Sequence, residues 1–518
     1  MFKNHPKGLI GAALSNMGER FGFYIMMAIL SLFLMSKFGL EKTQSTIIYS
    51  VFYALIYLLA LAGGLIADKT KKYKGTILIG LLCMSVGYAL IAIPTPTPVP
   101  DLPLFLTLTC IGLFVIAFGN GLFKGNLQAV VGQMYDDPKY SVKRDTGFQI
   151  FYMFINIGAL FAPLIAVGIR NWWVGAHGFT YNSDLPALCH QFLKGTISPE
   201  ATQRFTTLSA EVSRTAPADL TAFANQYLDV FNTGFHYAFA AAVVAMLISL
   251  VFFLSNRAKL PDPALRAAKS NDSNTADTPQ ISTQEVRQRL YALFAVFAVV
   301  IFFWFSFHQN GVTLTFFAND YTNLSWLKFD LGFTSIEGAE VFQFFNPFFV
   351  VFLTPIVISF FGWLRSRGKE MSTPRKIAVG MGIAATAFAV MALGSMGLPG
   401  AGEVKTMGGL SDAMRVTPFL LIGTYFILTI AELFISPLGL SFVSKVAPPQ
   451  YQGIMQGCWL GATALGNQLL ILGTIFYENI PIWATWCVFV TACLISMGTM
   501  LAMLKWLEKV SKQKMLYQ

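Results

Sequence analysis

The feature that most constrains this chain is a series of long apolar runs that are almost free of charge. Of its 518 residues, 55% are hydrophobic and 12% are charged, whereas soluble proteins average about 25% charged residues. A helix of roughly 20 apolar residues crosses the hydrocarbon core of a bilayer, and lipid forces backbone polar groups to bond internally. The pattern predicts an all-α integral membrane protein. It excludes a soluble enzyme, a disordered chain and a disulfide scaffold.

Twelve runs are long enough to span, and they are too continuous for the alternating strands of a membrane barrel. An even number of spans puts both termini on one side. Most of the 36 lysines and arginines fall on that side, so the positive-inside rule predicts cytoplasmic termini. The same bias explains the net charge of +10 without nucleic acid. The predicted spans are approximately 8–36, 45–67, 76–93, 102–131, 147–169, 234–254, 290–318, 341–364, 377–397, 416–440, 453–477 and 480–504.

Two long connections organise the chain. Residues 170–233 are polar and mixed, and we expect them outside as an insertion. Residues 255–289 contain prolines and a polar stretch typical of a flexible cytoplasmic linker. The linker separates six spans from six, which predicts an N-terminal bundle over 1–254 and a C-terminal bundle over 290–518. This division indicates the pseudo-twofold architecture of facilitator-type transporters.

The sequence offers no motif for a metal, a cofactor or an enzymatic reaction. The six cysteines form no CxxC pair, and neither HExxH nor GxSxG occurs. The first apolar run carries charges and lacks a cleavable signal pattern, so we expect it to be retained as a span. We therefore expect a multi-pass protein of the cell (inner) membrane that holds neither a metal nor a cofactor.

Four ionisable residues lie inside spans, where each costs about 2.5–3.5 kcal/mol at the helix centre. They are Glu19 and Arg20 in span one, Lys124 in span four and Glu432 in span ten. At about 1.5 Å of rise per residue, the two halves bring opposite charges to similar depths. Such residues usually face a bundle interior or a wet cavity. They could form a static ion-pair clamp, or a proton relay in which neighbouring charges control a carboxyl group.

Other residues within spans allow two interpretations each. His308 is either a hydrogen-bonded structural residue or a group that titrates near neutral pH. Asn346 and Ser436 each precede a proline, which either bends the helix or frees carbonyls toward a cavity. Gly121 and Gly125 form a small-xxx-small strip, which predicts helix packing.

Many of these residues together resemble the signatures of the proton-dependent oligopeptide transporter family, within the major facilitator superfamily. The resemblance implies that superfamily's fold, and a proton-coupled symporter that imports di- and tripeptides by alternating access. The matching segments are Glu19-Arg20-Phe21 with Phe23-Tyr24, Gly63-Gly64-xx-Ala67-Asp68, Gly121-xx-Lys124 with Asn126, Asp145-x-Gly147-Phe148-xx-Phe151-Tyr152-xxx-Asn156-x-Gly158, Phe303-Trp304 with Gln309, Gln343-xx-Asn346-Pro347, Glu432-Leu433-xx-Ser436-Pro437-x-Gly439-Leu440 and Trp459.

The resemblance also implies roles for individual residues. Lys124 and Arg20 would handle the peptide carboxylate and the proton network. Asn156, Asn346 and Glu432 would hold the peptide amino end. The walls of side-chain pockets would come from Tyr24, Tyr57, Trp304 and Trp459, and the expected substrate-binding set also includes Ser436. The expected proton-coupling set is Glu19, Arg20, Lys124, His308 and Glu432.

The chain departs from the family pattern at three positions. Asn16 replaces the usual first glutamate of helix one, Met27 replaces a second arginine, and His308 replaces a glutamate in span seven. These changes leave open a second hypothesis, in which the same fold carries nitrate, an amino-acid conjugate or another small anion. A peptide sensor or membrane scaffold is a third, although a scaffold has no need of costly buried charges. We expect the lipid bilayer, short peptides and protons as partners of a monomer.

Overall fold

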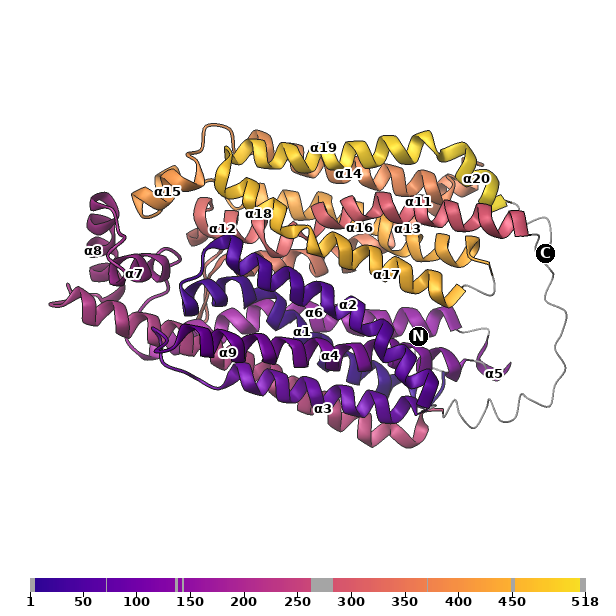
Figure 1. Ribbon diagram of the computed structural model, residues 1–518, viewed down its shortest axis with the longest axis horizontal. Helices are drawn as coiled ribbons and strands as arrows, with labels where there is room; N and C mark the ends of the chain where they lie inside the picture. The colour runs from indigo at the N-terminus through magenta and orange to yellow at the C-terminus, as the bar shows by residue number, and fades with distance from the viewer. Residues whose placement is uncertain are drawn as a thin grey trace.

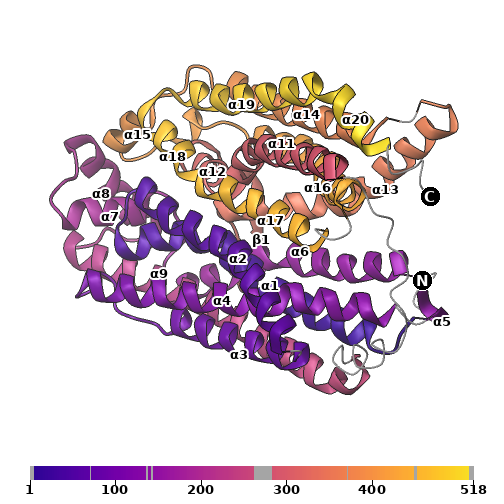
Figure 2. The same cartoon turned by 45° about the vertical axis from the view of Figure 1, so that its right-hand side comes forward.

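The computed structural model describes residues 5–70, 72–135, 138–141, 144–261, 283–369, 371–448 and 452–512. Twelve of its helices are long and apolar enough to cross a membrane, which confirms the predicted number of spans. They form two bundles that lie side by side, one from each half of the chain (Figures 1 and 2). Most of the predicted linker, residues 262–282, lies outside the described residues.

The N-terminal half contributes six spans and two shorter helices of the insertion. The helices α6 and α9 continue well past the predicted span ends, so the segment between them is shorter than predicted. Its elements are α1 (Leu9–Phe38), α2 (Lys42–Thr70), α3 (Tyr73–Ala92), α4 (Leu102–Met134), α5 (Pro138–Ser141), α6 (Arg144–Ala176), α7 (Leu185–Leu193), α8 (Pro199–Ser213), α9 (Leu220–Asn256) and the 3₁₀ helix η1 (Arg257–Lys259).

The C-terminal half contributes the other six spans, two of which are broken into two helices. A two-stranded antiparallel hairpin precedes η4. The elements are α11 (Thr283–Phe307), η2 (His308–Gly311), α12 (Thr313–Tyr321), η3 (Leu324–Leu327), β1 (Phe329–Asp330), β2 (Ser335–Ile336), η4 (Ala339–Phe344), α13 (Phe345–Ser366), α14 (Thr373–Gly394), α15 (Ala401–Met407), η5 (Asp412–Met414), α16 (Phe419–Val446), α17 (Gln452–Gln468), α18 (Leu470–Asn479), α19 (Ile482–Ala502) and α20 (Leu504–Lys512).

Glycines set the closest helix contacts in the N-terminal half. A Cβ atom on Gly63 of α2 would lie 2.0 Å from the carbonyl oxygen of Gly121 in α4, and one on Gly80 of α3 would lie 2.7 Å from that of Gly119. Lipid gives apolar side chains no hydrophobic reason to associate, so close backbone contact supplies the packing energy. Gly121 therefore packs as predicted, whereas Gly125 has no neighbour within 4 Å of its Cβ position.

Span seven is broken without a proline. Its regular helix stops before η2, and the freed carbonyl of Asn310 accepts a hydrogen bond from the Tyr425 hydroxyl at 2.9 Å. Span eleven is broken opposite this point, where Gln309 Nε2 donates to the carbonyl of Leu470 at 3.4 Å. Non-helical backbone at membrane depth persists only where protein or water satisfies it, and here side chains of neighbouring spans do so.

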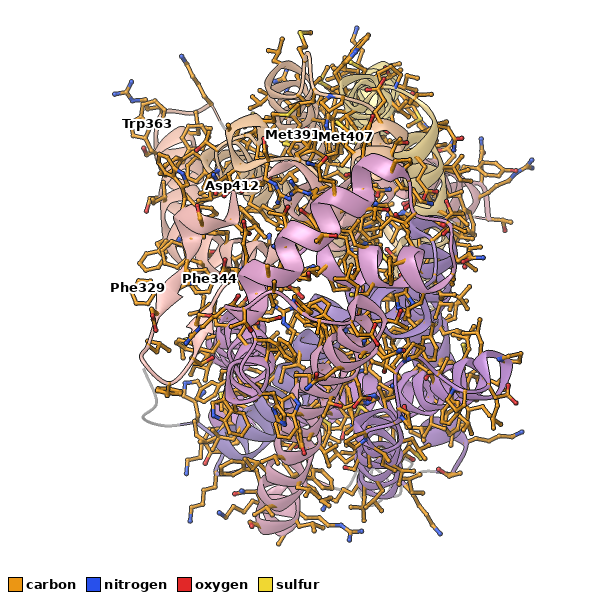
Figure 3. The ribbon with its side chains drawn as sticks, turned by 90° about the vertical axis from the view of Figure 1, so that its left-hand side faces the viewer. Phe329, Phe344, Trp363, Met391, Met407 and Asp412 are labelled. Atoms are coloured by element: carbon orange, nitrogen blue, oxygen red, sulfur yellow. The ribbon has the colours of Figure 1, made fainter. Side chains whose placement is uncertain are left out.

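The two halves are joined at one end, which we call the capped end because α7, α8 and α15 cover it (Figure 1). Viewed from this end, α7 and α8 lie across the centre, beside Met407 and Asp412 of the C-terminal half (Figure 3). In the part of the chain that the structure describes, every ion pair between the halves lies here. The pairs are Lys42–Asp320, Arg170–Glu340, Lys405–Glu41 and Arg415–Asp184.

Candidate functional site

Glu19 and Arg20 are consecutive in α1, and both side chains are buried. Arg20 grips the carboxylate with two hydrogen bonds, from Nε to Oε2 at 2.5 Å and from Nη2 to Oε1 at 2.7 Å. Asn120 of α4 adds a third, from Nδ2 to Oε1 at 2.6 Å. A buried charge needs a partner and hydrogen bonds, and this cluster supplies both. Asn120 was not among the predicted site residues, although it lies one helical turn before Lys124.

Lys124 is the predicted basic residue that does not belong to the cluster of Glu19, Arg20 and Asn120. Its ammonium lies 4.9 Å from the ring centroid of Tyr57 in α2, and its side chain is partly exposed. It also lies within electrostatic range of Glu19 and Arg20. Among the described residues no acid lies within ion-pair distance of Lys124, so the predicted neutral cluster of four charges is not one contact network.

Glu432 in α16 is the acid contributed by the C-terminal half. Asn346 Nδ2 at the start of α13 donates to its Oε2 at 2.9 Å and to Thr429 Oγ1 at 3.1 Å. The carboxyl group lies within electrostatic range of Tyr24 and Tyr57 in the N-terminal half. Glu432 is therefore held by its own half, within electrostatic range of tyrosines of the other half.

Tyr57 lies within electrostatic range of charged groups from both halves. It lies beneath Lys124 and within electrostatic range of both Arg20 and Glu432. The side chains of Tyr24, Lys124, Asn346 and Glu432 are only partly buried, although all belong to membrane spans. Ionised groups in spans usually face a bundle interior or water rather than lipid. We infer that this neighbourhood is wet.

Tyr152 and Asn156 lie on α6 at the edge of the same neighbourhood. Tyr152 is 54% exposed and lies within electrostatic range of Glu432. Asn156 Nδ2 donates to the carbonyl of Tyr152 at 3.1 Å rather than to Asn346 or Glu432. Tyr152 was part of the family-like pattern but was not chosen as a site residue. Its place on the face of α6 turned to the other half could not be read from the sequence.

His308 is hydrogen bonded on both ring nitrogens. Nε2 lies 3.2 Å from the Tyr53 hydroxyl, and Nδ1 contacts Asn467 Oδ1. Its ring stacks on Trp304 at 4.8 Å between centroids. This is the structural arrangement that the sequence left as one of two interpretations. Tyr53 in turn contacts Tyr57, with ring centroids 5.8 Å apart. Tyr53 therefore connects His308 to Tyr57.

The remaining predicted pocket residues are packed inside the C-terminal half. Trp304 is 8% and Trp459 3% exposed. The Trp459 ring packs against the backbone of Gly439, where a Cβ would lie 2.0 Å from the ring. Ser436 follows Glu432 by one helical turn, and its hydroxyl has no partner among the described residues. Trp304, Trp459 and the hydroxyl of Ser436 are therefore covered in this conformation.

The chain matches known proteins along nearly its whole length. The family model PTR2, described as the POT family, matches residues 74–262 and 263–483. A peptide transporter named YePEPT from Yersinia enterocolitica is 28% identical over 488 residues, covering 90% of this chain and 87% of that one. A di-/tripeptide transporter from Lactococcus lactis subsp. cremoris is 28% identical over 482 residues, covering 90% and 89%.

Solved structures show the same fold. A crystal structure of the peptide transporter POT in complex with sulfate has a TM-score of 0.71 at 23% identity, covering 98% of this chain and 96% of that one. A POT family transporter in complex with 5-aminolevulinic acid has a TM-score of 0.70 at 21% identity, covering 98% of both. The family match over most of the chain and the twelve spans lead to one conclusion: this chain belongs to the POT family of membrane transporters.

Proposed function

We propose that this protein imports di- and tripeptides together with protons, by alternating access. The observation that carries the proposal is the arrangement around Tyr57. A base of the N-terminal half, Lys124, lies over the ring of this residue, an acid of the C-terminal half, Glu432, lies within electrostatic range of it, and the two charges are not paired with each other. A short peptide is a zwitterion with a cation at one end and an anion at the other. Lys124 could hold its carboxylate, and Glu432 with Asn346 its amino group.

The conformation supports a mechanism in which the halves move against each other. The ion pairs between the halves gather at the capped end, and this end carries the insertion. The positive-inside rule puts the capped end outside and both termini in the cytoplasm of the cell membrane. The structure would then be closed to the outside, with Lys124 and Glu432 reached from the cytoplasm. The protein works as a monomer in this proposal, because each chain supplies both halves of the site.

The Glu19 cluster is our candidate for the coupling group. Glu19 is bound by Arg20 and Asn120, and Arg20 lies within electrostatic range of Tyr57. A peptide carboxylate that attracts Arg20 toward Lys124 would loosen the hold of Arg20 on Glu19. A carboxylate released from its cation accepts a proton more readily. Substrate and proton would therefore bind together.

The test uses the purified protein in liposomes with an imposed inward proton gradient. We expect dialanine to enter and to acidify the lumen, and unlabelled di- and tripeptides to compete with it. The variant Glu19→Gln should lose uptake driven by the proton gradient but keep counterflow of dialanine. Glu211→Gln, at an exposed position on α8, is the matched control and should behave like the wild type.

Two results would overturn parts of this proposal. Normal gradient-driven uptake by Glu19→Gln would remove that residue as the coupling group. Failure of every di- and tripeptide to compete, with nitrate or an amino-acid conjugate entering instead, would replace peptides with a small anion as the cargo.

A further inference from the structure

A short hairpin between spans seven and eight exposes a cluster of large apolar side chains. It follows η3 and consists of β1 and β2, which pair antiparallel. Four residues of η3 and the hairpin form what we call the apolar tip. They are Trp326 at 67% exposed, Phe329 at 68%, Leu331 at 45% and Phe333 at 74%. An exposed apolar patch marks a contact with another protein or with a membrane.

The charged groups of the hairpin bond within the hairpin itself. The Asp330 carboxylate accepts a hydrogen bond from the backbone N–H of Gly332 at 2.8 Å. Gly332 has a φ of +80°, which suits the turn that brings the chain back. At the base of the hairpin, Lys328 pairs with Glu337 at 3.2 Å. Because these charges are used internally, the surface that the hairpin turns outward is mainly apolar.

The second strand of the hairpin is bonded to the N-terminal half. Thr334 Oγ1 donates to the carbonyl of Gly168 in α6 at 2.6 Å. Asn171 Nδ2 of α6 donates to the carbonyls of Ser335 and Glu337, both at 2.9 Å. Here α6 also packs beside α13 of the C-terminal half, along a line that we call the seam. The hairpin belongs to the C-terminal half, so it forms a strap across the seam.

The position of the apolar tip favours the bilayer as its partner. The hairpin joins spans seven and eight at the capped end, so it lies where these spans leave the lipid. Seen from that end, Phe329 lies at the rim of the molecule rather than over its centre (Figure 3). On α6, Phe161, Ile165 and Trp172 share one helix face and are 40–50% exposed, which is the pattern of a lipid-facing surface. Tryptophan, as at position 326, is enriched at the boundary between membrane and water.

We propose that the apolar tip inserts into the leaflet on the capped side, at the boundary between phospholipid headgroups and acyl chains, and that the strap lets this leaflet hold the seam closed. The partner is the phospholipid interface itself. Anionic headgroups are not required, because Lys328 is already paired with Glu337. Zwitterionic phospholipid is therefore sufficient.

The strap gives the leaflet a preference for one conformation. The tip is held at its depth by hydrogen bonds to Gly168 and Asn171 that cross the seam. Opening the capped end moves α6 away from the C-terminal half, which breaks these bonds or pulls the tip out of the leaflet. A partner that binds one state more tightly shifts the population toward that state. The leaflet therefore stabilises the contacts that close the capped end, which we call the gate.

The first measurement is the depth of the tip in liposomes of zwitterionic phospholipid. A spin label is attached at Phe333 through a keto-bearing amino acid, because the six native cysteines are free and would react with a thiol label. Collisions of the label with oxygen report acyl chains, and collisions with a water-soluble nickel chelate report water. The reference positions are Val244, exposed in the middle of α9, and Thr215, exposed in the loop before α9.

We expect the ratio of oxygen to nickel collisions at position 333 to be several-fold higher than at Thr215 and lower than at Val244. A ratio equal to that at Thr215 would place the tip in water and overturn the proposal. A dipolar distance between singly labelled molecules would place a second copy of the chain at the tip, and this result would overturn it as well. The depth of the tip does not depend on the cargo, so its failure is distinct from failure of the proposed function.

The second measurement is the effect of the tip on the gate, which rests on the alternating access proposed above. Keto-linked spin labels are placed at Leu104 of α4 and Trp483 of α19, which are exposed and lie near the capped end in opposite halves. Electron–electron double resonance in liposomes gives the distance distribution between them. Phe329→Ser combined with Phe333→Ser should enlarge the long-distance population. Phe329→Trp combined with Phe333→Trp keeps affinity for the interface and should keep the wild-type distribution.

Met414→Ser is the matched control, because Met414 is an apolar residue of the same end that is 50% exposed but lies outside the tip. It should leave the distribution unchanged. If both double variants open the gate alike, the phenylalanines act by packing within the protein, and the role of lipid is overturned. If neither opens it, the strap does not transmit the hold of the leaflet. Should the double serine variant fail to fold, Phe333→Ser alone replaces it with the same expectation.

Discussion

At the scale of single residues, the site is defined by which charges are paired. Glu19 and Arg20 neutralise each other within one helical turn, as the static interpretation of the sequence allowed. Lys124 and Glu432 are not paired with each other; Lys124 lies over the ring of Tyr57, and Glu432 lies within electrostatic range of the same residue. Of the four charged residues predicted in the spans, Glu19 and Arg20 thus pair with each other, and Lys124 and Glu432 are the two that could bind a zwitterion.

Lys124 offers a prediction at this scale. Replacement of Lys124 by Gln should weaken dialanine binding by about 10- to 100-fold, because a hydrogen bond to a charged group is worth roughly 1.5–3 kcal/mol. Competition assays in liposomes measure the loss. Dialanine amide, which lacks the carboxylate, should bind the variant and the wild type equally. A similar loss for both ligands would show that Lys124 does not recognise the carboxylate.

At the scale of helices, glycine positions decide how closely two spans approach. The sequence treats Gly121 and Gly125 alike, because both belong to one small-xxx-small strip. In the structure a Cβ on Gly121 would lie 2.5 Å from the carbonyl oxygen of Leu59, whereas Gly125 faces open space. The contact between α2 and α4 thus depends on one of the two glycines.

The matched pair Gly121→Ala and Gly125→Ala tests this difference. Gly121→Ala should lower the midpoint of thermal unfolding, because overpacking of a close contact costs about 1–3 kcal/mol. Gly125→Ala should leave the midpoint unchanged or raise it slightly, since alanine favours a helix more than glycine does. Equal effects of the two substitutions in purified protein would contradict the crossing described here.

At the scale of the whole molecule, the insertion links the halves directly. Asp184, just before α7, binds Arg204 of the insertion and Arg415 of the C-terminal half through one carboxylate oxygen, each at 2.7 Å. Ser198 also donates to the carbonyl of Thr406 in α15. The insertion therefore helps to join the two halves at the capped end, a contact that its polar sequence did not reveal.

Loss of the ion pairs that Asp184 makes with Arg204 and Arg415 should shift the equilibrium between conformations. Asp184→Asn keeps the shape of the side chain but removes the charge that attracts two arginines, so the capped end should open more often at every pH. Electron–electron double resonance between spin labels at Leu104 of α4 and Trp483 of α19, two exposed positions near the capped end in opposite halves, would report a larger long-distance population. Asp412→Asn, exposed in the same region, should leave the distribution unchanged. No shift in Asp184→Asn would show that the other ion pairs are sufficient to close the gate.

Much of the fold followed from the sequence because the cost of polar groups in lipid acts on each segment separately. The twelve spans were predicted correctly on this ground, and the family was predicted correctly from the resemblance of its sequence signatures. The breaks in spans seven and eleven were not, since they depend on partners from other spans: Tyr425 binds the free carbonyl of Asn310, and Gln309 reaches Leu470. For the same reason the sequence placed Lys124 and Glu432 at similar depths but could not tell whether they would pair.

The sequence by itself determined that this chain crosses a membrane twelve times, in two groups of six, with a few ionised residues in its spans. Those conclusions rest on local composition, because each span must be apolar and must satisfy its own backbone hydrogen bonds within the lipid. Only the tertiary structure decided that Asn120 completes the Glu19 cluster, that Lys124 lies over the ring of Tyr57, and that Glu340 of one half pairs with Arg170 of the other. These contacts join residues far apart in the chain, and only the packing of one bundle against the other brings them within reach.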